Sequence, residues 1–340
     1  MEFNLLGQRT YPVEESGEPP LPPLKTYRDL DCPPRSSLLG KQALVIGYGL
    51  QGEPTALNLR DSGAEVTVGV RLDTASGARA VAADFPILDF TRPLPENFES
   101  IWILIPDSVQ ADILRQWILP AMHPTQLLVF AHGYALIHET LAMPRGVDVV
   151  VLAPHGPGKQ LRERYLAGEG LPAQVALWRD HSGISLTRAL QWGAGLGYDW
   201  GGMRPCTVKQ EVDLDHFVEQ TLLCGGLLAL AQAVYDTAIA QGYDPVQVYN
   251  STIGEVGNTA MLLQQYGPVE FYKRISEIAM KGSLLNGPAM VNDQSRAHLA
   301  ATLAQIESGA FIKALELPDM NKELRTRMQA LKAHPMTSDD

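Results

Sequence analysis

The chain of 340 residues is long enough for two domains of ordinary size. Hydrophobic residues make up 45% of it and charged residues 19%, a balance that excludes disorder of the whole chain. The 27 basic and 38 acidic residues give a net charge of −11, which argues against a broad nucleic-acid-binding face and against an anionic membrane as partner. This charge does not exclude a small anionic ligand, because such a ligand needs only a few local hydrogen-bond donors.

The three cysteines, Cys32, Cys206 and Cys224, lie far apart and show no metal-finger spacing. A reduced, cytoplasmic setting fits this pattern best. No unbroken apolar run reaches the roughly 18 residues that a membrane span needs, so we predict no transmembrane helix. The N-terminus also lacks the basic and apolar pattern of a signal peptide.

Residues 1–37 form a proline-rich segment. We expect an extended arm or a linker here, because proline continues neither a helix nor a central strand. A surface arm is the favoured interpretation, and an arm that packs across another subunit is the alternative. The prolines of this segment are Pro12, Pro19, Pro20, Pro22, Pro23, Pro33 and Pro34.

From Lys41 onward, short apolar runs alternate with helical patterns, such as the one at residues 110–118. This alternation predicts βαβ units around a buried parallel sheet. We therefore expect an α/β fold with a Rossmann-type, doubly wound domain over residues 38–182. The predicted strands are 43–46, 65–70, 100–105, 126–130 and 149–152, with 173–177 as a further candidate.

After residue 183 long helical patterns dominate the sequence. They predict an all-α second domain over residues 183–330, followed by a polar tail, 331–340. The predicted helices cover residues 184–196, 214–239, 245–264, 270–281 and 293–308.

The segment Gly47-Tyr48-Gly49-Leu50-Gln51-Gly52 fits the pattern G-x-G-x-x-G. The pattern alone is weak, but here it follows a predicted strand and opens a predicted helix, which is typical of a dinucleotide-binding turn. Gly47 would permit the tight turn, Gly49 would let the backbone approach the pyrophosphate, and Gly52 would let helix and strand pack closely. The first amides of the helix would then bind the phosphates.

The end of the second predicted strand bears on the choice of cofactor, because NAD sites usually carry Asp or Glu there for the ribose 2′-hydroxyl. Here Arg71 fits a 2′-phosphate, and Thr74 and Ser76 can donate hydrogen bonds to it. Asp73 is a conflicting neighbour, since it would repel that phosphate or bind a ribose hydroxyl. We expect NADPH, with NADH as the alternative; a solvated charge is the alternative for Arg71.

Three carboxylates in the helical region form a candidate metal site. Asp215 and Glu219 are four residues apart and should share one helix face, and Glu255 lies on the next helical pattern. Carboxylate oxygens suit a hard cation such as Mg²⁺. Without further information the solvated helix face is favoured over the metal site, because acidic pairs at this spacing are common on surfaces.

Several further motifs follow one another along residues 38–317. They are Ile46–Gly52, Ala56–Gly63, Ile105-Pro106-Asp107, Phe130-Ala131-His132-Gly133, Ala153–Gly158, Asp215-x-x-x-Glu219-Gln220 and Cys224-Gly225-Gly226. In this order they resemble the short class of ketol-acid reductoisomerases. The resemblance implies two Mg²⁺ ions that drive an alkyl migration in a 2-acetolactate-type substrate, and NADPH that reduces the resulting 2-keto acid. It further implies a homodimer with intertwined helical domains, in which Glu255 serves the neighbour's site, and it leaves a higher homo-oligomer open.

The same resemblance assigns further site residues. Pro106, His132 and Gly133 would border the cofactor, and Pro154, Ser251 and Ser276 would border the substrate together with Asp215, Glu219 and Glu255. Ser276 matches the serine that contacts the substrate carboxylate, although its neighbours differ from the family's usual polar run. The candidate catalytic residues are His132, His155, Asp215, Glu219 and Glu255.

Two departures from the family concern the metal and proton-transfer positions. His155 stands where the family carries a lysine, and Ser251 stands where it carries a fourth carboxylate. Serine cannot supply a carboxylate's charge, so a second Mg²⁺ should bind much more weakly. Glu53 and Pro54, just after the glycine turn, also replace a histidine and a small residue.

Three interpretations remain open at this point. The favoured one is an NAD(P)H-dependent reductase that acts on a small carbonyl or imine in a specialised pathway, with the isomerase activity weakened or lost. The second is a true Mg²⁺-dependent ketol-acid reductoisomerase of branched-chain amino-acid synthesis. The third is a dinucleotide-binding protein without catalysis, which is least favoured because Asp215, Glu219, Glu255 and Ser276 persist.

Overall fold

The computed structural model describes residues 2–3, 9–10, 32–89 and 97–336. The chain divides into two compact units, Met1–Val212 and Asp213–Asp340. Most of the proline-rich segment predicted as an arm, including residues 11–31, lies outside the described residues. Its last part is ordered against the first unit, where Arg35–Leu38 form a 3₁₀ turn and the side chain of Leu38 is fully buried.

The first unit is built on an eight-stranded sheet with the order β10-β9-β8-β7-β6-β3-β4-β5. The order reverses beside β3, whose neighbours are β4 and β6, as in doubly wound folds. All pairings are parallel except that of β8 with β9. The strands are β3 Gln42–Ile46, β4 Glu65–Gly69, β5 Ile87–Leu88, β6 Ser100–Ile103, β7 Leu127–Phe130, β8 Asp148–Pro154, β9 Ala173–Arg179 and β10 Met203–Pro205; β1 Glu2–Phe3 and β2 Arg9–Thr10 form a separate antiparallel pair.

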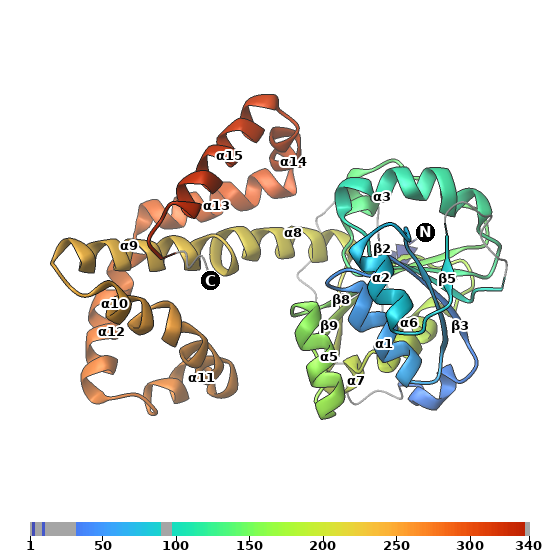
Figure 1. Ribbon diagram of the computed structural model, residues 1–340, viewed down its shortest axis with the longest axis horizontal. Helices are drawn as coiled ribbons and strands as arrows, with labels where there is room; N and C mark the ends of the chain where they lie inside the picture. Colours follow the sequence, from blue (N-terminus) through green and yellow to red (C-terminus); the bar gives the residue numbers. More distant parts are fainter. Residues whose placement is uncertain (1, 4–8, 11–31, 90–96, 337–340) are drawn as a thin grey trace. The chain divides into compact units, whose positions relative to one another are not determined.

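Both faces of this sheet are buried, because successive side chains of its strands enter two different apolar clusters. Val45 and Trp102 belong to the cluster under α1, α5 and α6, whereas Ile46 and Ile103 belong to the cluster under α3 and α4. Figure 1 shows α3 on the opposite side of the sheet from α1 and α6. The helices are α1 Gly52–Asp61, α2 Ala75–Ala82, α3 Asp107–Ile113, α4 Tyr134–His138, α5 Gly158–Ala167, α6 Ser185–Gly195, α7 Tyr198–Gly201 and α8 Val208–Val218, with a π turn at Leu114–Ile118 and a 3₁₀ turn at Leu119–Ala121.

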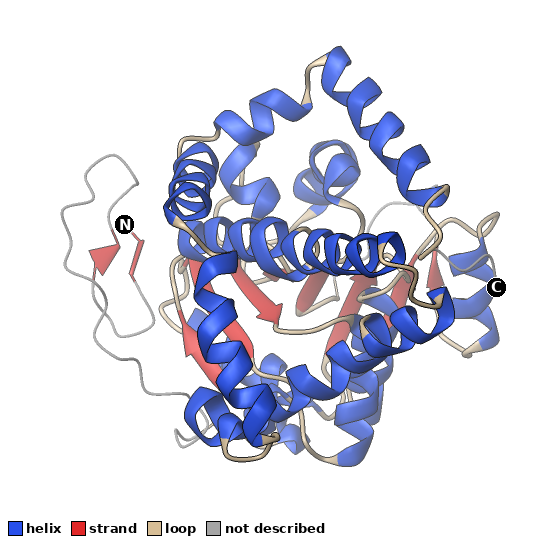
Figure 2. Cartoon of the chain, turned by 90° about the vertical axis from the view of Figure 1, so that its left-hand side faces the viewer, coloured by secondary structure: helices blue, strands red, loops and turns tan. Residues whose placement is uncertain are grey.

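The second unit begins within α8, and all its described elements are helical (Figure 2). Helix α11 is broken at Gly267, which has a φ of 71° and precedes Pro268. Few apolar side chains of the described part of this unit are buried: Ala231, Tyr235, Val248, Ile306 and Met336. Its elements are a π turn at Glu219–Leu223, α9 Gly226–Ala240, α10 Pro245–Ser251, α11 Ile253–Tyr272, α12 Glu277–Met290, α13 Asp293–Glu307, α14 Ala310–Leu315 and α15 Pro318–Lys332.

The predicted fold class is confirmed, and the structure refines its details. The first unit extends to Val212 rather than ending at 182, because α6 packs on the sheet and β10 joins its edge. The sheet is mixed rather than wholly parallel. The single helix predicted at 214–239 is interrupted by the π turn, and α15 covers the start of the predicted polar tail.

Candidate active site

The glycine turn after β3 has the geometry that its sequence predicts. Gly47 has a φ of +98°, and a Cβ atom there would come within 2.5 Å of the carbonyl oxygen of Leu104. A Cβ at Gly52 would lie 2.1 Å from the carbonyl oxygen of Gly47. A Cβ at Gly49, in contrast, would meet nothing within 4 Å. The outer glycines are therefore required by packing, whereas Gly49 leaves the backbone open to a ligand.

A second loop, residues 155–158 before α5, lies directly against this turn. A Cβ at Gly158 would come within 1.6 Å of the carbonyl oxygen of Leu50, so no other residue fits there without movement. Gln51 Nε2 donates to the carbonyl oxygen of Gly156 at 3.3 Å, and Gln51 Oε1 is buried without a hydrogen-bond partner among the described residues. The open backbone at Gly49 and this buried acceptor fit a bound dinucleotide.

Polar side chains gather where three neighbouring parallel strands end. Asp107 follows β6, His132 follows β7 and His155 follows β8, so all three lie at one edge of the sheet. The first turn of α8 adds Glu211, which is 3% exposed. Its Oε1 lies 2.9 Å from His132 Nδ1, and its Oε2 accepts from the Gly133 amide at 2.9 Å. A carboxylate only accepts, so this pair favours the His132 tautomer with hydrogen on Nδ1.

Gly133 is needed for this arrangement. A Cβ atom there would lie 2.5 Å from Val208 Cγ1 and 2.9 Å from Val212 Cγ2, both on the face of α8 that packs against the sheet. Glycine therefore lets α8 approach closely enough for Glu211 to bond the Gly133 amide.

Two pKa values at this edge are shifted in opposite directions, mainly because the surrounding protein desolvates both groups. Desolvation raises the pKa of the Asp107 carboxyl; the charge of His132 opposes this increase and the charge of Glu211 adds to it. The protein around His155 lowers its pKa although the side chain is solvent-exposed, and Glu211 only partly offsets this. His155 is therefore neutral at pH 7. Gln110 fixes the Asp107 carboxylate by donating to its Oδ1 at 2.8 Å.

At the end of β4 the residues predicted to bind a 2′-phosphate are engaged locally. Arg71 Nε lies 3.9 Å from Asp73 Oδ1, and both side chains are exposed. Thr74 caps α2, because its hydroxyl donates to the Arg71 carbonyl oxygen at 2.7 Å and accepts from the Gly77 amide at 3.1 Å. Ser76 lies in the first turn of the same helix. The phosphate-binding role of Thr74 stays a prediction and requires its bond to Arg71 to open.

Comparison with known proteins decides the family. Residues 37–202 match the acetohydroxy acid isomeroreductase NADPH-binding domain, and residues 208–339 match the ketol-acid reductoisomerase C-terminal domain. The chain belongs to the ketol-acid reductoisomerase family. It is an NADP-dependent oxidoreductase, and the resemblance to the short class is confirmed.

Relatives and solved structures agree with this assignment. The chain is 34% identical over 312 residues to a ketol-acid reductoisomerase (NADP(+)) of Pyrobaculum arsenaticum, covering 91% of this chain and 94% of that one. The corresponding protein of Pyrobaculum calidifontis is 34% identical over 314 residues, with 92% and 95% covered. An NADH-preferring ketol-acid reductoisomerase from an uncultured archaeon superposes with a TM-score of 0.84 at 28% identity, with 92% of this chain and 96% of that chain covered. A semialdehyde dehydrogenase NAD-binding protein from Cupriavidus necator, with a TM-score of 0.58 at 17% identity and coverage of 79% and 100%, shares the fold alone.

Of the remaining residues assigned from the reductoisomerase motifs, Pro106 precedes α3 and Pro154 ends β8 in the first unit. The others lie in the second unit and are solvent-exposed. Asp215 lies in α8 and Glu219 opens the π turn that follows; Ser251 ends α10, and Glu255 lies in the first turn of α11. Ser276 caps α12, since its Oγ accepts from the Ala279 amide at 3.2 Å. The roles of these residues in metal or substrate binding stay predictions.

Glu211 was missed by the sequence analysis although a signal was present. It lies four residues before Asp215, as Asp215 lies four before Glu219, so three acids follow one another at helical spacing. Asp107 was noted only as part of a motif, and nothing in the sequence indicates that its pKa is shifted. Both findings depend on which strand ends and helices the fold brings together.

One helical stretch of the described chain, Val208–Ala240, is long and apolar enough by length and composition to cross a membrane, which the sequence analysis did not anticipate. The stretch carries Glu211, Asp215 and Glu219 and opens the matched reductoisomerase C-terminal domain. Membership in that domain accounts for the helix without a membrane.

Proposed function

We propose that this reductoisomerase relative is an NADPH-dependent reductase for a small carbonyl or imine substrate, that its isomerase activity is weakened or lost, and that it serves a specialised pathway for a modified amino acid or another secondary metabolite. His155 carries the proposal. A lysine at this position would be positively charged at pH 7, whereas His155 is neutral because its surroundings lower its pKa. A neutral imidazole can exchange a proton with a substrate, but it adds no fixed positive charge beside a metal cluster.

Ser251 supports the same proposal from the second unit. Its hydroxyl replaces a carboxylate of the family pattern, which leaves Asp215, Glu219 and Glu255 as candidate metal ligands. Three carboxylates can hold one hard cation better than they can hold two cations, because a second Mg²⁺ would lack charge compensation. The rearrangement needs the polarising effect of both ions, whereas reduction needs less.

The first unit supplies the candidate proton donors for the reduction step. Bound NADPH supplies a hydride to the substrate carbon. The chain must then deliver one proton to the oxygen or nitrogen of the reduced group, and His132 and His155 are the candidate donors. Because a neutral imidazole is a base, the donating histidine first takes up a proton from solvent and then gives that proton to the substrate. Glu211 positions the His132 ring by accepting from Nδ1 at 2.9 Å, and we assign the proton exchange to Nε2.

The strongest alternative is a true ketol-acid reductoisomerase with an unusual site. The 34% identity to proteins of that name over nine-tenths of the chain favours it. Under this alternative His155 and Ser251 are tolerated replacements. A non-catalytic dinucleotide-binding protein is favoured by no observation on the site.

The two active candidates differ in one assay. NADPH oxidation is followed with Mg²⁺ present, using 2-acetolactate and 3-hydroxy-3-methyl-2-ketobutyrate in parallel, since the second compound needs reduction only. Turnover of the second compound alone supports the proposal, and turnover of both refutes it. If neither is consumed while NADPH still binds, a panel of cyclic imines and other 2-keto acids is tested, and turnover of any of these supports the proposal. Failure of the whole panel refutes it.

A matched pair of variants sharpens this assay. Because His155 and Ser251 are the proposed causes of the loss, the double variant His155→Lys/Ser251→Glu should gain Mg²⁺-dependent turnover of 2-acetolactate. The variant Glu169→Gln, at an exposed position in the loop after α5 and outside the assigned site, is the control for unspecific effects of substitution. If the wild-type protein is an active reductase and the double variant gains no turnover of 2-acetolactate, residues other than His155 and Ser251 cause the loss of isomerase activity.

We further propose that the protein works as a homodimer in a cytoplasmic setting. Large apolar side chains of the second unit are exposed in the single chain, including Ile278 (85%) and Leu285 (79%). Patches of this kind mark interfaces, and no disulfide is present among the described residues. Light scattering should give twice the chain mass of 37.1 kDa. A monomer at micromolar concentration would refute the dimer.

The dimer allows a direct test of the shared site. If Glu255 serves the neighbour's site, Asp215→Asn and Glu255→Gln each inactivate both sites of their own homodimer. After mixing and reassociation, one site in each heterodimer carries both wild-type residues, so about a quarter of all sites should be active. Activity no higher than that of the separate variants would show that both residues belong to one chain's site.

A further inference from the structure

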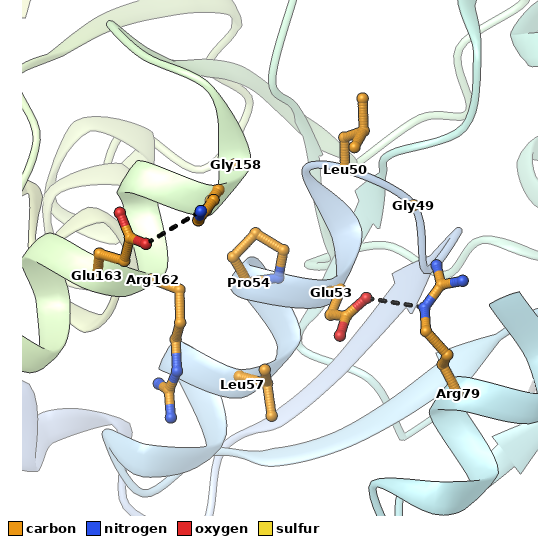
Figure 3. A pocket seen from close by; sticks show the side chains of 10 residues that line it. Gly49, Leu50, Glu53, Pro54, Leu57, Arg79, Gly158, Arg162 and Glu163 are labelled. Atoms are coloured by element: carbon orange, nitrogen blue, oxygen red, sulfur yellow. Dashed lines mark hydrogen bonds and ion pairs between the residues drawn. The ribbon is translucent and has the colours of Figure 1, made fainter. Parts of the chain in front are cut away.

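An ion pair beside the glycine turn has no role in the function described so far. Glu53, in the first turn of α1, accepts from Arg79 Nε of α2 at 3.0 Å. Arg79 Nη2 also donates to the carbonyl oxygen of Tyr48 at 3.0 Å. Arg79 thus ties α2 to the glycine turn. Figure 3 shows this pair on one side of a cavity that is also lined by Gly49 and Leu50.

The position of Arg79 places its charge between two parts of the cofactor site. The glycine turn, with Tyr48, is the pyrophosphate-binding part, and the segment from Arg71 to the start of α2 is the ribose-binding part of such folds. Arg79 belongs to α2 and contacts Tyr48, so its guanidinium lies where these two parts meet. The cavity beside it has a volume of about 410 Å³ and is lined by the glycine turn, α1, α5 and Arg79.

The residues expected to bind a 2′-phosphate already interact with other groups of the chain, so a further cationic side chain can contribute to binding that phosphate. Asp73 stands 3.9 Å from the Arg71 guanidinium, and the Thr74 hydroxyl hydrogen is already bonded to a backbone carbonyl. Arg79 has five N–H groups, of which the contacts to Glu53 and Tyr48 use two. It can therefore donate to a phosphate without releasing the glycine turn.

Glu53 acts against this role. Its carboxylate lies in the first turn of the helix whose amides receive the cofactor phosphates, and it also neutralises the Arg79 charge. We propose that Arg79 is a specificity-determining residue that favours NADPH over NADH by binding the 2′-phosphate, and that Glu53 limits this preference by pairing with Arg79. The proposal uses the cofactor class of the family and is independent of the loss of isomerase activity.

The test measures binding rather than turnover. Dissociation constants for NADPH, NADH, 2′,5′-ADP and 5′-ADP are determined by calorimetry on the full-length protein. Arg79→Gln should weaken NADPH and 2′,5′-ADP about five- to tenfold and NADH and 5′-ADP less than twofold, because only the former carry the 2′-phosphate. Glu53→Gln should tighten NADPH and 2′,5′-ADP about threefold, since the pair is partly exposed and screened.

Arg162→Gln is the matched control. Arg162 lines the same cavity but bonds Asp61 at 2.7 Å and Asn58 at 2.8 Å between α1 and α5. It should leave the ratio of NADPH to NADH affinity unchanged. Equal losses for both nucleotides in Arg79→Gln, an unchanged ratio in Glu53→Gln, or the same selective loss in Arg162→Gln would each overturn the proposal. If Arg79→Gln does not fold, Arg79→Lys and Glu53→Gln carry the test, with the lysine variant expected to keep part of the preference.

Discussion

Glu211→Gln tests whether the carboxylate beside His132 sets its tautomer. Both Glu211 oxygens accept hydrogen bonds at 2.9 Å, and the residue is 3% exposed, so glutamine fits the space but replaces one oxygen by an NH₂ group. If that NH₂ faces the Gly133 amide, two donors meet. If it faces His132, Nδ1 must become an acceptor, and the hydrogen moves to Nε2. Either arrangement costs one buried hydrogen bond to a charged group, about 1.5–3 kcal/mol.

The loss of this hydrogen bond should lower the catalytic rate. If the cost falls on the positioned imidazole in the transition state, kcat for 3-hydroxy-3-methyl-2-ketobutyrate, or for whichever carbonyl or imine is turned over, should drop about 10- to 150-fold. The KM for NADPH should stay within about twofold, since Glu211 has no predicted contact with the cofactor phosphates. Because the Gly133 amide can only donate whereas the imidazole can change tautomer, we expect the glutamine NH₂ to face His132. Long-range ¹H–¹⁵N NMR spectra of labelled protein should therefore show His132 changing from the Nδ1–H to the Nε2–H form.

The exposed Glu169, in the loop after α5, supplies the control Glu169→Gln, which changes the net charge equally and should alter neither rate nor spectrum. An unchanged tautomer together with a kcat within twofold of the wild type would refute the reasoning. A large loss of thermal stability without a tautomer change would show that Glu211 serves mainly to hold α8.

Three further predictions concern stability and cofactor choice. Burial alone would raise the pKa of Asp148, but hydrogen bonds from Ser182, Arg188 and His181 lower it. The ionised Asp148 therefore stabilises the folded protein fully at pH values above the pKa of the unfolded chain. This stabilisation is lost as the pH falls through the lower pKa of the folded state. Asp148→Asn should remove about 3 kcal/mol at pH 7 and flatten this acid dependence in urea unfolding, and an unaltered dependence would contradict the assignment. Thr125 has a φ of 79° although it is β-branched, so Thr125→Gly should raise the unfolding free energy by about 1 kcal/mol, and a lower melting temperature would count against strain at this turn. Asp73→Ser should improve NADPH binding two- to fivefold over NADH, as expected for removal of about 0.5–1 kcal/mol of screened repulsion, whereas a gain for both nucleotides would exclude repulsion of the 2′-phosphate.

Six strands of the large sheet, β3, β4, β6, β7, β8 and β9, could be predicted because each is a short apolar run between breaks. The two-residue β5 and the three-residue β10 were not predicted, because so short a segment carries no distinct pattern. The directions of the strands could not be predicted either. β9 is mostly apolar like the parallel strands, yet it runs antiparallel to β8, since the pattern of a buried strand does not depend on its direction. The prediction of one continuous helix over 214–239 was wrong for a related reason. A π turn adds one residue without interrupting the apolar pattern, so the sequence shows no break where the helix geometry changes.

The candidate site could likewise be predicted from the sequence only in part. The glycine turn could be recognised in the sequence because the motif sets its local geometry: Gly52 meets the carbonyl oxygen of Gly47, and Gly47 meets that of Leu104, just after the neighbouring strand β6. The protonation state of His155 could not be predicted from the sequence. It depends on how much protein surrounds the imidazole and on Glu211, which is 56 positions away along the chain and is brought near by the packing of α8. A histidine in place of lysine could have kept a positive charge had Glu211 outweighed the desolvation. Since desolvation is the larger effect, the substitution removes the charge at pH 7 as well as the chain length of lysine, and this makes position 155 the most informative one at which to restore the family residue.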